Sequence, residues 1–210
     1  MNIKTAQPHC RVVARDRNHL RSLIERYTAY SDSVDLNFID VSQVQAMYSL
    51  FSGLTFNGDI SQWDVSGVKT MEYMFHDSIF NGNLSLWDVS GVLSMAGMFL
   101  SSRFNGDVSQ WNVSSVKRMD FMFAYSLFQG DVSSWNVGSV SHMESMFQNA
   151  PFCGDISSWR IGQVLDPERS HFCRDLSLSQ YHEYCVQRQS LVACYGDTPL
   201  HSKVKPLTIL

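Results

Sequence analysis

Four cysteines and two histidines near the end of the sequence are the residue types best suited to binding a metal ion. They are Cys153, Cys173, Cys185 and Cys194, with His171 and His182. Structural zinc sites are usually built on closely spaced Cys-x-x-Cys pairs, which these residues do not form. The chain has five cysteines, so any disulfide scheme leaves one unpaired. Unbonded thiols are therefore predicted, zinc and disulfides stay as alternatives, and no cofactor is expected.

A column of acidic residues raises the possibility of calcium binding. Its members stand 24 residues apart, and each directly follows a glycine. They are Asp59, Asp107, Asp131 and Asp155, with Asn83. Calcium takes roughly six to eight oxygen ligands, and one such side chain per repeat supplies too few. We therefore predict that each side chain accepts a hydrogen bond from its own turn backbone.

Five tryptophans share the same spacing and could stack against bases or sugars. They are Trp63, Trp87, Trp111, Trp135 and Trp159. Because tryptophan recurs without exception, packing in the core is the favoured interpretation. Residues 31–165 hold 5 basic and 13 acidic residues, a balance that repels phosphate. Nucleic acid is therefore not an expected partner.

Motifs for nucleophilic catalysis or phosphate binding do not occur in the sequence. It lacks Gly-x-Ser-x-Gly, a Walker loop and His-Glu-x-x-His. A serine recurs in every repeat, which suits a row of hydroxyl hydrogen bonds better than catalysis. We predict that the protein is not an enzyme.

The same 24-residue step governs most of the large apolar residues. The further columns begin at Phe56, Gly58, Val68, Met71, Met74 and Phe75, and a degenerate first copy starts near Asp35. One unit cannot bury such side chains alone, whereas stacked units can. The array covers residues 35–164.

Each unit divides into two parts with different periods. After an Asn-Gly-Asp turn, the alternating residues Ile60–Val65 predict a short extended segment. Val68, Met71, Met74 and Phe75 then share one face of a predicted short helix, with Ser66 as its N-cap. The fold expected is an α/β repeat solenoid, leucine-rich-repeat-like, of about five and a half 24-residue turns with caps at both ends.

The unit Phe56-Asn-Gly-Asp-Ile-Ser-Gln-Trp-Asp-Val-Ser66, followed by Val68, Met71, Met74 and Phe75, resembles the BspA-like leucine-rich repeats of bacterial surface proteins. The resemblance covers residues 35–164. It implies a β/α solenoid with a binding role, usually in adhesion. Similar repeats occur in phage and mobile-element proteins, and the family has no shared catalytic residues.

The two ends of the chain lack the repeat and are predicted to cap it. Residues 1–34 are a basic N-terminal cap, with a strand over Cys10–Ala14 and a helix after Asp16. Residues 165–195 are a C-terminal cap, with a helix over Ser179–Val192, and residues 196–210 are predicted to form a flexible tail. Solenoids need such polar ends.

The overall composition fits a folded protein outside the membrane. Hydrophobic residues make up 44% of the 210 residues and charged residues 17%, which excludes global disorder. No segment has the roughly 20 apolar residues of a membrane span, and residues 1–8 lack the apolar part of a signal peptide. A cytoplasmic location is expected.

Columns that vary between repeats are the candidates for binding, because invariant columns form the scaffold. Several variable positions carry leucines, aromatics and single charges, the composition of an interface. Packing against the neighbouring turn is the alternative. The candidate partner-binding residues are Tyr73, Ile79, Leu86, Leu93, Leu100, Arg103, Arg118, Asp120, Phe121, Tyr125 and Leu127.

These features predict a protein-protein interaction module. The favoured function is an intracellular inhibitor or adaptor, with a phage or mobile element as its candidate source and a host or defence protein as its candidate target. A surface adhesin-type repeat protein is one alternative. A metal-binding or catalytic C-terminal cap at residues 153–194 is the other. The partner, the oligomeric state and the face that binds are left open.

Overall fold

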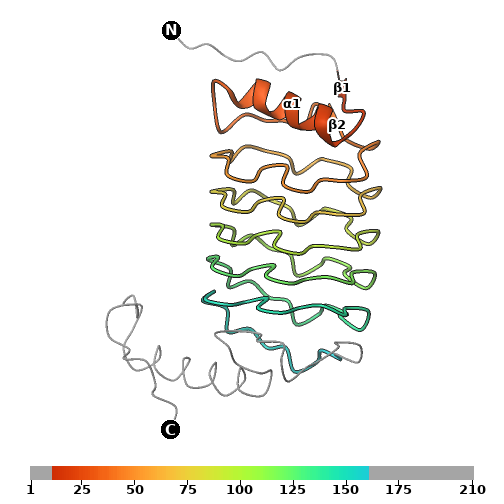
Figure 1. Ribbon diagram of the computed structural model, residues 1–210, viewed down its shortest axis with the longest axis vertical. Coiled ribbons are helices and arrows are strands. Elements are labelled where there is room, and N and C mark those ends of the chain that lie inside the picture. Colours follow the sequence, from red (N-terminus) through yellow and green to blue (C-terminus); the bar gives the residue numbers. More distant parts are fainter. Residues whose placement is uncertain (1–10, 161–210) are drawn as a thin grey trace, which may run out of the picture.

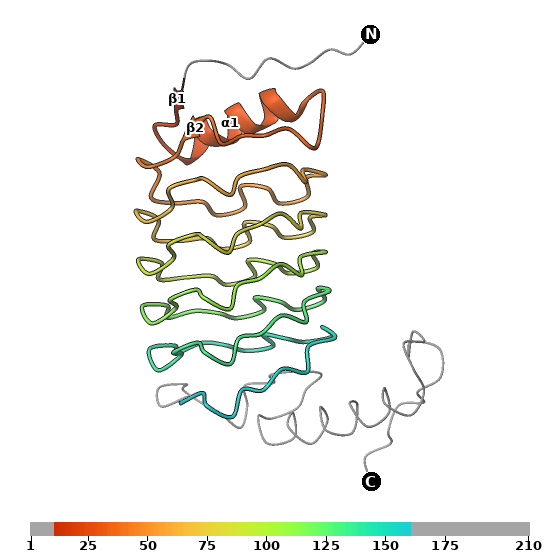
Figure 2. The ribbon, with the colours of Figure 1, turned by 180° about the vertical axis from the view of Figure 1, so that it is seen from behind.

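The computed structural model describes residues 11–160, which form a flattened stack of coils (Figures 1 and 2). Each coil has two long runs that enclose the core between them. Counted from Asp35, coils 1 to 5 are residues 35–58, 59–82, 83–106, 107–130 and 131–154. The predictions for the C-terminal cap, the tail, Cys173, Cys185, Cys194, His171 and His182 lie outside the described residues.

The N-terminal end carries the regular secondary structure of the described chain. Strand β1 (Val12–Val13) pairs in parallel with strand β2 (Ile39–Asp40). Helix α1 (Arg17–Thr28) begins after Asp16, whose carboxylate accepts the N–H of His19 at 2.9 Å. This side chain satisfies one of the amide donors that a helix start leaves open. The helix predicted after Asp16 is confirmed, and the strand predicted over Cys10–Ala14 is shorter, with only Val12–Val13 in strand form among its described residues.

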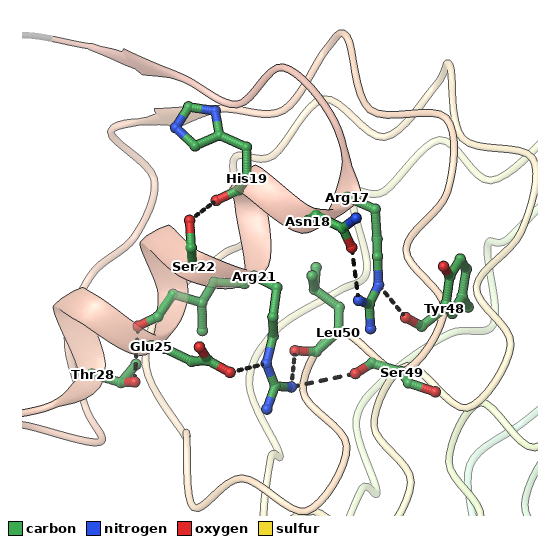
Figure 3. A network of polar contacts seen from close by, with 11 residues as sticks. Arg17, Asn18, His19, Arg21, Ser22, Glu25, Thr28, Tyr48, Ser49 and Leu50 are labelled. Carbon is green, nitrogen blue, oxygen red and sulfur yellow. Dashed lines mark hydrogen bonds and ion pairs between the residues drawn. The ribbon is translucent and has the colours of Figure 1, made fainter.

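Helix α1 covers the open end of coil 1 (Figure 1). Its buried side chains, Leu20, Leu23 and Ile24, join the core of the coils. On its polar side, Arg21 donates to the carbonyl of Leu50 at 2.7 Å, and Arg17 donates to that of Tyr48 at 3.0 Å (Figure 3). Two of the basic residues predicted for the cap therefore bind backbone acceptors of the first coil.

Parallel backbone hydrogen bonds join each coil to the next. They lie in what we call the ladder segments, which are residues 45–53, 69–77, 93–101, 117–125 and 141–149. Alternate N–H groups of one segment donate to carbonyls of the next, such as Tyr73 to Ala96 at 2.9 Å and Phe75 to Met98 at 2.8 Å. Isolated parallel bridges align Thr70, Ser94, Arg118 and His142.

The prediction of a short helix over Val68–Phe75 is wrong. These residues form successive turns, with Met74 N–H donating to Met71 at 3.2 Å and His76 N–H to Tyr73 at 3.1 Å. The turns still bury Val68, Met71 and Met74. Since the N–H groups of Met71, Tyr73 and Phe75 bond to the next coil, pairing between coils replaces the bonds within a helix.

The segment predicted to be extended forms turns within its own coil. We call residues 59–66 and their equivalents the Trp segments; in the first of them Trp63 N–H donates to Ile60 at 3.2 Å. Ser66 is not a helix cap, because its N–H and hydroxyl both donate to Asp64, at 3.1 and 2.7 Å. Side-chain acceptors of this kind stabilise turns.

Aromatic columns fill the space between the two runs. The Phe75 ring lies 5.5 Å from Phe99, and the Trp111 ring lies 6.5 Å from Trp135, each pair nearly parallel. Each described tryptophan also donates its indole N–H to a carbonyl in the preceding coil, as Trp63 does to Leu36 at 3.0 Å. The prediction that tryptophan belongs to the core is confirmed, and the indoles are not a stacking platform.

Candidate partner-binding face

The outward side of the ladder segments, which we call the ladder face, is shaped by residues in the left-handed backbone region. Two positions in each segment have positive φ, represented by Tyr73 and Asp77 in coil 2 and by Phe121 and Tyr125 in coil 4. Residues other than glycine adopt this conformation at a cost of roughly 1–2 kcal/mol. Glycine is accepted at both positions, as Gly97 and Gly53 show.

Several predicted site residues lie together on this face. Tyr73, Leu93, Phe121 and Tyr125 belong to ladder segments of coils 2 to 4, and their exposed fractions run from 36% to 53%. The corner that follows the ladder segment carries three more exposed residues of the prediction, Ile79, Arg103 and Leu127. Together these residues place apolar surface across three adjacent coils.

Two of the predicted residues are not exposed as expected. Asp120 is only 6% exposed, because its carboxylate pairs with the Nε of Arg118 at 3.0 Å. Arg118 itself stays exposed. Leu100 is half-buried. Asp120 therefore acts as the internal counterion of Arg118, and the expectation that it faces solvent is wrong.

Leu86 lies on the opposite run from the other predicted residues. It precedes the buried Trp87 in a Trp segment and is 76% exposed. Tryptophan rings of this run pack across the core against phenylalanines of the ladder segments, as Trp111 does against Phe99 at 6.4 Å. Because Trp87 is buried in the core between the two runs while its neighbour Leu86 is exposed, Leu86 lies on the outer side of the run opposite the ladder face.

Sequence reasoning missed Tyr48, which is exposed on the ladder face of coil 1. The guanidinium of Arg17 lies 4.5 Å from the centre of its ring, a cation–π contact. Tyr48 occupies the same column as Glu72 and Asp120. The variation in that column was the signal that could have identified it.

The acidic column has the turn role that was predicted. In each case the side-chain oxygen accepts the N–H of the serine two residues later; Asp59 and Ser61 are 2.9 Å apart, and Asn83 and Ser85 are 3.0 Å apart. These backbone hydrogen bonds are the main reason that the pKa values of Asp59, Asp107 and Asp131 lie below the ordinary value. Within residues 11–160, no group of three or more His, Cys, Asp or Glu could hold a metal ion.

Two surface hollows on this part of the chain are shallow. One, of about 290 Å³, lies beside Trp135 and Arg160, and another, of about 360 Å³, lies between the start of α1 and Tyr48. Small-molecule sites are usually enclosed clefts that bury most of a ligand. Neither of these two hollows has the enclosed form of a small-molecule site.

The chain belongs to a family described as Mycoplasma protein of unknown function, DUF285. The family model matches residues 18–126 and again residues 80–180, which together span more than half of the sequence. No curated protein and no solved structure matches the chain. Among the residues the structure describes, no helix has the length and apolar character needed to cross a membrane.

Proposed function

We propose that this protein is a non-enzymatic module that binds another protein through its ladder face. The observation that carries the proposal is the set of exposed aromatic and aliphatic side chains on coils 2 to 4, especially Phe121 and Tyr125. Both occupy left-handed positions at which the other coils use Gly, Ser, Asp or Asn, apart from Tyr73 at the position equivalent to Phe121. Large side chains kept at strained, exposed positions indicate a functional contact rather than a stabilising one.

The architecture supports this proposal. We propose that the stacked coils form a leucine-rich-repeat-like solenoid, with turns in place of the helix of each unit. The residue pattern resembles BspA-like repeats, and the coils expose side chains from consecutive units on one rigid surface. Repeat proteins use such extended surfaces for binding.

Within this class we favour an intracellular inhibitor or adaptor. The resemblance to BspA-like repeats favours a second candidate, a surface adhesin. Protease treatment of intact producing cells, followed by detection of the protein, separates the two. Protection from the protease is expected for the first candidate, and degradation is expected for the adhesin.

The binding proposal is tested by comparing three baits in extracts of the producing cells. They are the wild type, Phe121→Ser/Tyr125→Ser on the ladder face, and Leu86→Ser/Gln110→Ser on the Trp segments. Because a few central aromatic residues dominate most protein interfaces, we expect the ladder-face variant to recover at least about tenfold less of a specific partner. The control should match the wild type. Equal recovery by all three baits would contradict the proposal.

A further inference from the structure

The charges of the ladder face change sign on the two sides of coil 3. The ladder segment of coil 2 has two carboxylates and one lysine, so it is net negative. That of coil 4 exposes two basic side chains beside the buried Asp120, so it is net positive. The ladder segment of coil 3 has no charged residue. The charged residues of the two flanking segments are Lys69, Glu72, Asp77, Lys117, Arg118 and Asp120.

The same inversion extends to the outer coils. On coil 1, Arg17 of α1 lies over the ring of Tyr48, 4.5 Å from its centre. On coil 5, the equivalent residue of the column is the exposed Glu144, and the ladder segment of this coil has no lysine or arginine. From coil 1 to coil 5 the face therefore runs positive, negative, neutral, positive and negative. Reversing the order of the coils exchanges each positive coil with a negative one.

The middle of the face is built of small residues. Ser94, Ala96 and Gly97 of coil 3 are buried. The ring of Tyr73 lies against this segment, since a Cβ atom at Gly97 would be 2.4 Å from one of its ring carbons. An aromatic ring is therefore seated at the centre of the face, with charged residues of coils 2 and 4 on either side. Aromatic centres with polar surroundings are typical of the energetic core of interfaces.

We propose that the ladder face binds a second copy of this chain, with the two stacks antiparallel and a two-fold axis along the ladder segment of coil 3. The coils stack directly on one another (Figures 1 and 2), and the row of bridges through Thr70, Ser94 and Arg118 keeps them in register. The axis therefore sets coil 2 of one copy against coil 4 of the other, and coil 1 against coil 5. Because a two-fold interface uses the same patch on both copies, a face whose charges invert about its middle is complementary to itself.

Glu72 of one copy and Arg118 of the other form the main ion pair of this arrangement. Glu72 accepts the hydroxyl of Ser94 at 2.6 Å, so its carboxylate reaches toward the axis in coil 3. Arg118 donates its Nε to Asp120 at 3.0 Å, and its two terminal nitrogens remain to donate to Glu72 of the second copy. The two Tyr73 rings meet at the axis.

Sedimentation velocity of the purified full chain over a concentration series tests the dimer. Tyr73→Ser should weaken dimerisation at least about tenfold, since it removes the central aromatic contact. Glu72→Gln keeps an acceptor for Ser94 and should weaken dimerisation at least about threefold, because symmetry uses the ion pair twice. Asp32→Asn is the matched control, because it removes an exposed carboxylate outside the ladder segments, and it should leave the dimer unchanged.

The variant Lys69→Glu distinguishes this arrangement from other modes of association. Lys69 and Lys117 occupy the same column, so the two-fold axis sets one against the other across the interface. The substitution replaces this repulsion with an attraction and should tighten the dimer at least about threefold, although it makes the chain more acidic. Misfolding cannot produce such a gain. A weaker or unchanged dimer for Lys69→Glu, or equal dimerisation by Tyr73→Ser and the wild type, would overturn the inference.

The outcome is distinct from that of the binding proposal, because these measurements use the purified chain alone. The inference goes beyond the proposed function by naming a second copy as the occupant of the face when no other protein binds it. A wild type that stays monomeric at every concentration would overturn the inference. If the ladder-face variant then still lost a partner in cell extracts, the face would be left to that partner and the proposed function would stand.

Discussion

At the scale of single residues, two side-chain acceptors in each coil bend the backbone. Asp59 and Asp64 serve coil 2, and each accepts the N–H of the serine two residues later. Asparagine serves equally well where it replaces aspartate, as Asn83 and Asn112 do. The role needs an acceptor oxygen and not a charge.

The carboxylates of this kind make stability depend on pH. The pKa values of Asp107 and Asp131 are lowered from 3.8, chiefly by the backbone N–H of Ser109 and Ser133. A lowered pKa in the folded state means that the stabilisation is complete above the unfolded value and is lost as pH falls through the folded value. Between pH 7 and pH 3, the free energy of unfolding measured with urea should therefore fall less for Asp107→Asn/Asp131→Asn than for the wild type. An equal fall in the two proteins would contradict the claim that the ionised forms of Asp107 and Asp131 stabilise these turns.

Glycine in the column two residues after the repeating phenylalanine is required by close packing. A Cβ atom at Gly82 would lie 2.7 Å from the ring of Phe80. Gly82→Ala should therefore destabilise the protein by about 1–3 kcal/mol, the usual cost of overpacking, measured by urea unfolding. Gly67→Ala is the matched control, because its nearest neighbour, the Ser42 carbonyl, is 3.5 Å away. Equal destabilisation by the two substitutions would contradict the role of close packing at Gly82 and would indicate that the conformational freedom of glycine explains the effect.

At the scale of elements, the ladder segments combine pairing between coils with left-handed turns. Ser101 occupies such a turn, with φ of 56°. Ser101→Gly should stabilise the protein by about 0.5–1 kcal/mol, since glycine avoids the steric cost. Ser101→Val should destabilise it, because a β-branched residue fits this region poorly. Thermal unfolding of both variants checks this, and a less stable glycine variant would be the contrary result.

Helix α1 is expected to stabilise the first coil against local unfolding through Arg21. Its guanidinium binds the carbonyls of Ser49 and Leu50, at 3.3 and 2.7 Å (Figure 3). Arg21→Met keeps the apolar stem but should cost about 1.5–3 kcal/mol, the range for hydrogen bonds from charged groups. Amide hydrogen exchange in coil 1 should become faster, while Arg26→Met, an exposed control, should leave it unchanged. Unaltered exchange in the Arg21 variant would argue against the capping role.

Sequence periodicity predicted the buried columns and the side-chain-capped turns, because both depend on residues within one unit. It did not predict which half of the unit pairs with its neighbours. Val68, Met71 and Met74 can be buried by a helix or by turns, and a single unit does not distinguish bonds within a coil from bonds between coils. The hydrogen bonds from the N–H groups of Met71 and Tyr73 to the next coil therefore could not be predicted from one unit.

At the scale of the whole molecule, stacking decides which variable residues share a face. The sequence grouped Leu86 and Asp120 with the aromatics, but stacking puts Leu86 on the other run and buries Asp120 beside Arg118. It also shows that Tyr73 fits Gly97 of the next coil. Such relations join residues of different units, so they are not contained in any one column.

The most direct test of the ladder face is site-specific photo-crosslinking in the cells that produce the protein. A photoreactive phenylalanine at Phe121 replaces one exposed aromatic ring with another, and the same group at Gln110 samples the opposite run. The proposed binding role predicts one discrete protein adduct from position 121, lost in the Tyr125→Ser background, and none from position 110. No adduct at position 121, or the same adducts from both positions, would contradict it.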